Sequence, residues 1–118
     1  MKNGNENIVV TKSYSFSLRI IKLFVFLKKN NEFDLSRQVL RSGTSIGANI
    51  EEAQGGQSKK DFISKISIAY KEARETHYWL RLLRDSDFIE SKLAESLVTD
   101  CEELVKMLTS ILNSSKKS

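Results

Sequence analysis

Residues 91–112 have the sequence SKLAESLVTDCEELVKMLTSIL, and their apolar side chains recur at steps of three and four residues. This spacing puts the apolar side chains on one face of an α-helix, whereas a strand would need them at every second position. The pattern is close to a heptad repeat, which is typical of helices that pack lengthwise against each other. We therefore expect a long helix with one buried face, formed by Leu93, Leu97, Cys101, Leu104, Leu108 and Ile111.

Similar apolar spacing upstream predicts three more helices, each bounded by residues that start or stop helices. The third has the clearest start, because Ser58 is a good N-cap and Asp61 follows three residues later, as in a capping box. The Asn30-Asn31 pair closes the first helix, and Gly55-Gly56 closes the second. The predicted ranges are 11–29 (or 13–29), 34–54 (or 36–54) and 58 to about 85, before the last helix at 91–112.

Gly43 and Gly47 lie one turn apart inside the second predicted helix. Each costs roughly 1 kcal/mol relative to alanine in a helix interior. Either the pair allows another helix to approach closely, or the helix is locally broken there. We favour close approach.

The composition agrees with a helical fold. The 118 residues include no proline and only five glycines, so the regular turn signals of an all-β protein are missing. Four helices with short connections predict an all-α fold, an antiparallel up-down-up-down four-helix bundle. We expect a flexible N-terminus over residues 1–10, the bundle over 11–112, and a polar tail over 113–118.

Two of the predicted helices carry more apolar surface than one core needs. Residues 23–27 are all apolar and extend around the whole helix, although a surface helix needs only about three apolar positions in seven. The third helix has apolar residues outside its main stripe as well. The excess predicts a homo-oligomer, with contacts near Phe26, Ile68, Trp79 and Leu82.

The formal net charge of +4 is unevenly distributed. Residues 1–30 and 58–85 have an excess of Lys and Arg, whereas residues 31–57 and 86–118 have an excess of Asp and Glu. One interpretation is attraction between neighbouring helices. The other is a positive face that binds an anionic polymer.

Few residues suit catalysis. His77 is the only histidine, and neither Glu72 nor Glu75 has the Glu-x-x-His spacing that puts two metal ligands on one helix face. Cys101 lies in a core stripe, where a thiol is usually inert, and no phosphate-loop motif is present. We therefore predict no catalytic residue, no metal, no cofactor and no small-molecule substrate.

The sequence also predicts a cytoplasmic protein. A single cysteine cannot form an internal disulfide, which fits a reducing compartment. Residues 1–6 are polar and show no secretory signal, and no apolar run is long enough to span a bilayer.

An unusual polar stripe runs along the second predicted helix, where Ser45, Asn49 and Glu52 are spaced i, i+4 and i+7. Small polar residues compete for backbone hydrogen bonds and are poor helix formers. Their grouping predicts a polar network that reaches Glu75 or Arg74 on the third helix. A solvated face is the alternative.

Residues 45–53, SIGANIEEA, together with 58–62, SKKDF, closely resemble a bacterial four-helix bundle family first recognised as products of intervening sequences in 23S rRNA genes. The resemblance covers roughly residues 12–112. The family motif is approximately Ser-Ile-Pro-x-Asn-Ile-Ala-Glu-Gly, so Gly47, Glu51 and Ala53 depart from it and indicate a divergent branch. Its polar positions match Ser45, Asn49 and Glu52, and a family glutamate on the third helix matches Glu75.

The resemblance implies a homopentamer, because relatives assemble as rings of five. It also suggests a nucleic-acid role by analogy, since the related accessory variability determinant protein of diversity-generating retroelements is a basic pentamer that binds nucleic acid and a reverse transcriptase. Fold alone does not fix function.

The leading hypothesis is therefore a non-enzymatic oligomer that binds RNA or a nucleoprotein through a basic surface on the first and third helices. The rival hypothesis is a structural or adaptor oligomer that recruits a protein partner and has no nucleic-acid role. A hydrolase or metalloprotein is a weaker third option. The candidate nucleic-acid-binding residues are Arg19, Lys22, Lys28, Lys59, Lys60, Lys65, Arg74 and Arg81.

Overall fold

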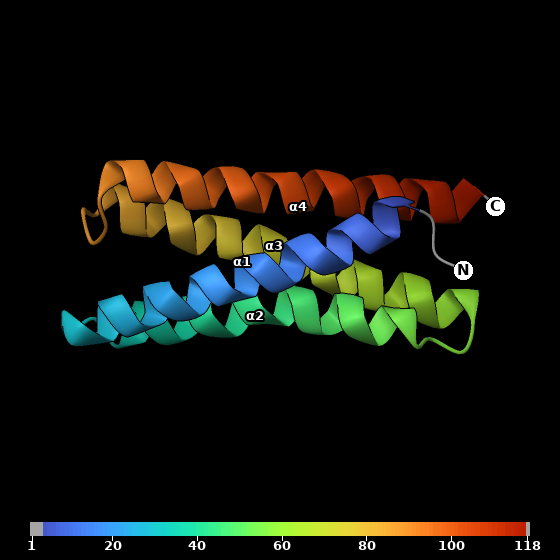
Figure 1. Ribbon diagram of the computed structural model, residues 1–118, viewed down its shortest axis with the longest axis horizontal. Coiled ribbons are helices and arrows are strands. Elements are labelled where there is room, and N and C mark those ends of the chain that lie inside the picture. Colours follow the sequence, from blue (N-terminus) through green and yellow to red (C-terminus); the bar gives the residue numbers. More distant parts are fainter. Residues whose placement is uncertain (1–3, 118) are drawn as a thin grey trace.

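The computed structural model describes residues 4–117, and the side chains of residues 8–116. Within them lie four helices: α1 (Gly4–Lys29), α2 (Asp34–Gln54), α3 (Lys59–Asp85) and α4 (Ser91–Lys117). Consecutive helices run in opposite directions, with the α1–α2 and α3–α4 turns at one end and the α2–α3 turn at the other (Figure 1). This confirms the predicted up-down-up-down bundle.

The order of the helices around the bundle determines which surfaces can combine. α1 packs against α2 and α4, and α3 packs against the same two helices, whereas α1 and α3 make no contact within the described residues. α1 and α3 therefore lie at diagonally opposite corners. α1 also runs obliquely to the other three helices (Figure 1).

One apolar core runs the length of the bundle, and α4 contributes the predicted stripe from Leu97 to Ile111. Leu93, the first member of that stripe, is the exception because its side chain is exposed. The largest fully buried side chains come from all four helices: Val9, Phe16, Ile20, Leu27, Ile46, Ile50, Ile66, Leu80, Leu83, Leu97, Leu104 and Leu108.

The two helical glycines allow α1 and α2 to come close together. A Cβ atom on Gly43 would lie 2.9 Å from both Cγ1 and Cγ2 of Ile20, and one on Gly47 would lie 3.2 Å from the Ser17 hydroxyl. α2 is continuous through both positions. The prediction of close approach is confirmed, and a local break is excluded.

The predicted turn signals act as expected. Ser58 caps α3, because its hydroxyl accepts a hydrogen bond of 3.0 Å from the backbone N–H of Asp61. Asn31 and Asp87 follow α1 and α3 with φ of 65° and 61°, a left-handed conformation that Asn and Asp tolerate better than most residues. The backbone N–H of the residue after each one donates a hydrogen bond to a carbonyl oxygen in the last turns of the preceding helix, Glu32 to Leu27 and Phe88 to Leu83. This pattern closes a helix without glycine.

The helical ends differ from the predicted boundaries. α1 begins at Gly4, well before the predicted start at residue 11 or 13, and Val9 is fully buried in the core. α4 likewise extends through most of the predicted tail, to Lys117. Only residues 1–3 and 118 lie outside the described residues. The short group Ile8-Val9-Val10 was too brief to show helical periodicity in the sequence, yet packing against the core places it in the helix.

Candidate interaction surfaces

α1 carries a second apolar stripe on the side away from the core. We call Tyr14, Leu18, Ile21 and Val25 the outer stripe; their spacing of four, three and four residues is that of a coiled-coil seam. Their exposures are 63%, 48%, 45% and 45%. Scattered exposed apolar residues are normal, but a continuous row of them on one helix marks an interaction site.

The residues predicted to contact another copy occupy other positions. Phe26 is exposed beside a hollow between α1 and α4 that Leu93 and Lys22 also line. Ile68 is exposed on α3. Trp79 and Leu82 are only partly exposed, and the indole Nε1 of Trp79 donates a 2.9 Å hydrogen bond to Glu75. The outer stripe is thus a stronger candidate contact than the predicted α3 positions.

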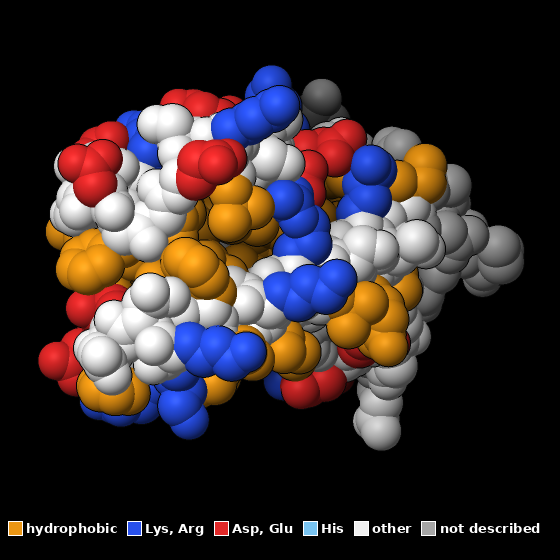
Figure 2. Space-filling view, turned by 60° about the vertical axis from the view of Figure 1, so that its left-hand side comes forward, with side chains coloured by type: hydrophobic (Ala, Val, Ile, Leu, Met, Phe, Trp, Pro, Cys, Tyr) orange, Lys and Arg blue, Asp and Glu red, His pale blue; other side chains and the backbone are white. Residues whose placement is uncertain are grey.

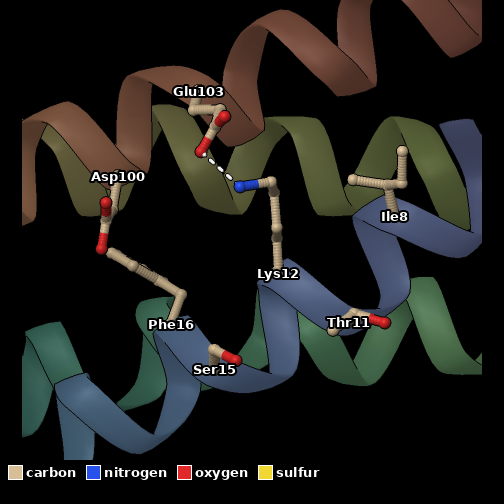
Figure 3. Close-up of a pocket in the computed structure, with 7 residues that line it drawn as sticks. All are labelled: Ile8, Thr11, Lys12, Ser15, Phe16, Asp100 and Glu103. Atoms are coloured by element: carbon tan, nitrogen blue, oxygen red, sulfur yellow. Dashed lines mark hydrogen bonds and ion pairs between the residues drawn. The ribbon is translucent and has the colours of Figure 1, made fainter.

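A second hollow, of about 500 Å³, lies between the N-terminal half of α1 and the middle of α4. Figure 3 shows Lys12 extending from α1 across this hollow toward Glu103, with Nζ 3.1 Å from Oε1, whereas the hydroxyls of Thr11 and Ser15 do not point toward that pair. A further ion pair, Arg19 with Asp100 at 2.6 Å, holds the same two helices together. The hollow is therefore crossed by one ion pair, Lys12 with Glu103, and Asp100 at its edge forms the other with Arg19.

Cys101 is adjacent to this acidic part of α4 but does not face the hollow. Its thiol is buried and donates a 3.3 Å hydrogen bond to the carbonyl oxygen of Ala73. Burial, together with the negative charges of Glu102 and Asp100, raises the pKa of this thiol to about 12. A thiol that stays protonated is a poor nucleophile.

The basic helices α1 and α3 form ion pairs with their acidic neighbours. Besides the two pairs between α1 and α4, Lys65 of α3 contacts Glu52 of α2 at 2.7 Å, and Arg84 of α3 contacts Glu95 of α4 at 3.4 Å. The alternating charge therefore does provide attraction between neighbouring helices. Because α1 and α3 are diagonal, the predicted basic surface from these two helices is not one continuous face within a single chain.

The eight predicted nucleic-acid contacts fall into three groups. Arg19 and Lys65 are in the ion pairs above. Lys28, Arg74 and Arg81 lie over aromatic rings, with their charged centres 5.5, 5.8 and 5.9 Å from the ring centres of Phe24, Tyr70 and Tyr78. Lys22, Lys59 and Lys60 are exposed. On the face drawn in Figure 2, Lys and Arg side chains are interspersed with hydrophobic and acidic ones.

Comparison with known proteins places the chain in a family. The family model described as 23S rRNA-intervening sequence protein matches residues 5–110. The chain belongs to this family. A comparison with curated proteins found no match.

A solved structure supports the same assignment. A crystal structure of a protein of unknown function from the S23 ribosomal protein family of Bacteroides thetaiotaomicron VPI-5482 is 49% identical in sequence to this chain. The match covers 92% of this chain and 98% of the other, with a TM-score of 0.90.

In this member of the family, the side chains of the predicted polar stripe do not form one network within a single chain. The hydroxyl of Ser45 and the amide of Asn49 donate to backbone carbonyls of their own helix, at 2.6 and 2.8 Å. Glu52 pairs with Lys65, and Glu75 pairs with Arg41. Glu75 is thus linked to α2 through Arg41, which stands one turn before Ser45 in the same stripe. Within one chain, Asn49 therefore bonds to neither Glu75 nor Arg74, and a network of these residues at an interface between copies stays a prediction.

The structure also contains a buried polar contact between α2 and α3 that the sequence did not indicate. The fully buried hydroxyls of Thr76 and Ser42 lie 2.9 Å apart, and Thr76 also donates to the carbonyl of Glu72 at 2.7 Å. Ser42 stands among other small polar residues in the sequence, and its partner is 34 residues away. Only the packed helices reveal the pair.

No group of three or more His, Cys, Asp or Glu side chains among the described residues could hold a metal ion. His77 instead lies 3.0 Å from Glu102 across the α3–α4 contact. None of the described helices is both long enough and apolar enough to cross a membrane.

Proposed function

We propose that this member of the 23S rRNA-intervening sequence protein family is a non-catalytic, self-associating bundle that binds RNA or a nucleoprotein. The observation that carries the proposal is the outer stripe of α1, since four large apolar side chains in a heptad row favour packing against another helix. Fully burying one such side chain contributes about 1.5–3 kcal/mol. A homopentamer is the assembly that the family resemblance implies.

RNA binding through a continuous basic surface also depends on self-association. α1 and α3 are basic but diagonal in one bundle, so a continuous basic surface has to come from neighbouring copies. Exposed cations such as Lys22, Lys28 and Lys60 are available for phosphate contacts. The proposal places the protein in the cytoplasm, where a lone thiol stays reduced.

A specific observation favours the adaptor alternative. Several cations on α1 and α3 already neutralise acids on α2 and α4, as in the pairs of Arg19 with Asp100 and Lys65 with Glu52. In that case the charges hold the helices together and keep the protein soluble, and the partner is another protein.

Binding to a fluorescent structured RNA across a salt titration separates the two candidates, using protein whose mass in solution is known. RNA binding should weaken steeply with salt, because each phosphate contact releases counterions. Lys22→Glu with Lys60→Glu should reduce the affinity strongly. Lys92→Glu with Lys116→Glu, which changes the net charge equally at exposed positions of α4, is the matched control. Absence of binding at low salt would favour the adaptor.

A further inference from the structure

The exposed face of α3 carries a row in which tyrosine and arginine alternate. Tyr70, Arg74, Tyr78 and Arg81 are spaced four, four and three residues apart, and so follow one side of the helix. We call them the Tyr–Arg row. The Arg74 guanidinium lies 5.8 Å from the ring centre of Tyr70 and donates to its hydroxyl at 2.8 Å. The Arg81 guanidinium lies 5.9 Å from the ring centre of Tyr78.

The two arginines of this row differ from all others in the chain. Arg19, Arg37, Arg41 and Arg84 each form an ion pair with a carboxylate. Among the described residues, neither Arg74 nor Arg81 lies within 4.0 Å of one. Neither guanidinium is therefore tied up in a direct ion pair, although the hydrogen bond from Arg84 and, to a smaller extent, the nearby charge of Arg81 lower the pKa of the Asp85 carboxyl.

Three members of the row, Arg74, Tyr78 and Arg81, are exposed, and Tyr70 is partly buried. Tyr78 is 48% exposed, and its ring meets that of Trp79 edge-on at 5.2 Å. Arg74 also borders a hollow of about 370 Å³ between α3 and α4, which Lys106 lines from the other side together with Glu102, whose carboxylate lies 3.0 Å from His77. A ligand on the row thus meets aromatic rings and three cationic side chains, those of Arg74, Arg81 and Lys106.

We propose that the Tyr–Arg row is a stacking site for single-stranded nucleic acid. Unpaired bases stack on aromatic rings and on guanidinium planes, and their phosphates favour cations that lack acidic partners. Eight residues of helix separate Tyr70 from Tyr78 by about 12 Å, so the two rings serve different bases. A duplex hides its base faces and cannot use this site. This inference rests on the proposed function, to which it adds the strandedness of the ligand.

The test uses the full chain with fluorescent oligouridylate, oligothymidylate and an RNA duplex of equal length. Tyr78→Leu keeps the charge and removes the ring, so it should lower the affinity for both single strands about 5- to 100-fold. Arg74→Lys with Arg81→Lys should also weaken binding, because lysine keeps the charge but has no planar group. Phe33→Leu removes an exposed aromatic ring from the α1–α2 turn and should change nothing. The emission of Trp79, the only tryptophan, should change as single strands bind.

Several results would overturn the inference. If Tyr78→Leu binds single strands as the unchanged protein does, or if the duplex binds more tightly, the row is not a stacking site although the proposed function stands. If no nucleic acid binds at low salt, the proposed function and the inference fail together. If Tyr78→Leu alters the mass in solution, the row is a contact between copies.

Discussion

At the scale of single residues, the close contact between α1 and α2 depends on the missing side chain of Gly43. A Cβ there would meet both branches of Ile20 at 2.9 Å, and a β-branched side chain in a helix has almost no freedom to move aside. At Gly47 the nearest atom is the Ser17 hydroxyl, at 3.2 Å. The two glycines therefore differ in how strictly they are needed.

Gly43→Ala should lower the free energy of unfolding by about 1 kcal/mol, the middle of the range left by two opposing effects. Alanine gains about 1 kcal/mol in helix propensity, but overpacking against Ile20 costs about 1–3 kcal/mol. Urea unfolding monitored by circular dichroism measures the difference. Gly47→Ala is the matched control. There the gain in helix propensity should offset the smaller steric cost of the contact with Ser17, so the stability should change little. Equal stability of Gly43→Ala and the unchanged protein would contradict the packing described above.

Cys101 gives a prediction about pH. Burial raises the pKa of its thiol from an ordinary 9.0 to about 12, so the folded state holds this proton more tightly than the unfolded state does. Its contribution to stability is complete below pH 9 and is lost as the pH rises toward 12. The free energy of unfolding should therefore fall less steeply above pH 9 in Cys101→Ala than in the unchanged protein. Parallel pH profiles of the two proteins would show that the thiol is not buried as described.

At the scale of helices, sequence signals that act locally were reliable. The cap at Ser58, the glycine stop after α2 and the Asn31 turn depend on neighbouring residues, and each stands where the pattern placed it. The predicted start of α1 was too late, because the three apolar residues at 8–10 are too few to show a helical periodicity. The sequence did not predict that Glu75 pairs with Arg41, for another reason. The spacing of residues identifies the face of a helix on which they lie, but not the residue that they meet on the neighbouring helix.

Ser58→Ala should destabilise the bundle by about 1 kcal/mol, because the N–H of Asp61 loses its acceptor at the start of α3. The measurement is the denaturation midpoint in urea. Ser64→Ala, an exposed position in the second turn of α3, should have no such cost, since it caps nothing. If Ser58→Ala lowered the denaturation midpoint less than Ser64→Ala does, that result would contradict the capping role of Ser58.

At the scale of the whole molecule, the antiparallel topology has a consequence for function. It places α1 and α3 diagonally, so that some of their positive charges pair with acids of α2 and α4, as Lys65 does with Glu52, and the rest face two different sides of one chain. The diagonal placement of α1 and α3 follows from the predicted up-down-up-down order of the helices. The charge pattern alone, however, suggested that the two helices share one basic surface. The outer stripe was visible in the sequence as an excess of apolar residues on α1, but only the bundle shows which of them remain uncovered.

The central claim is that the outer stripe of α1 joins copies of this chain, and the mass in solution tests it most directly. Light scattering after size-exclusion chromatography should give an oligomer for the unchanged protein. Leu18→Glu with Ile21→Glu should give a monomer that keeps its helical circular dichroism, because both side chains lie outside the core. Glutamate at the exposed positions Thr99 and Thr109 of α4 is the control and should leave the oligomer intact. An unchanged protein that is monomeric, or a double variant that still assembles, would contradict the account.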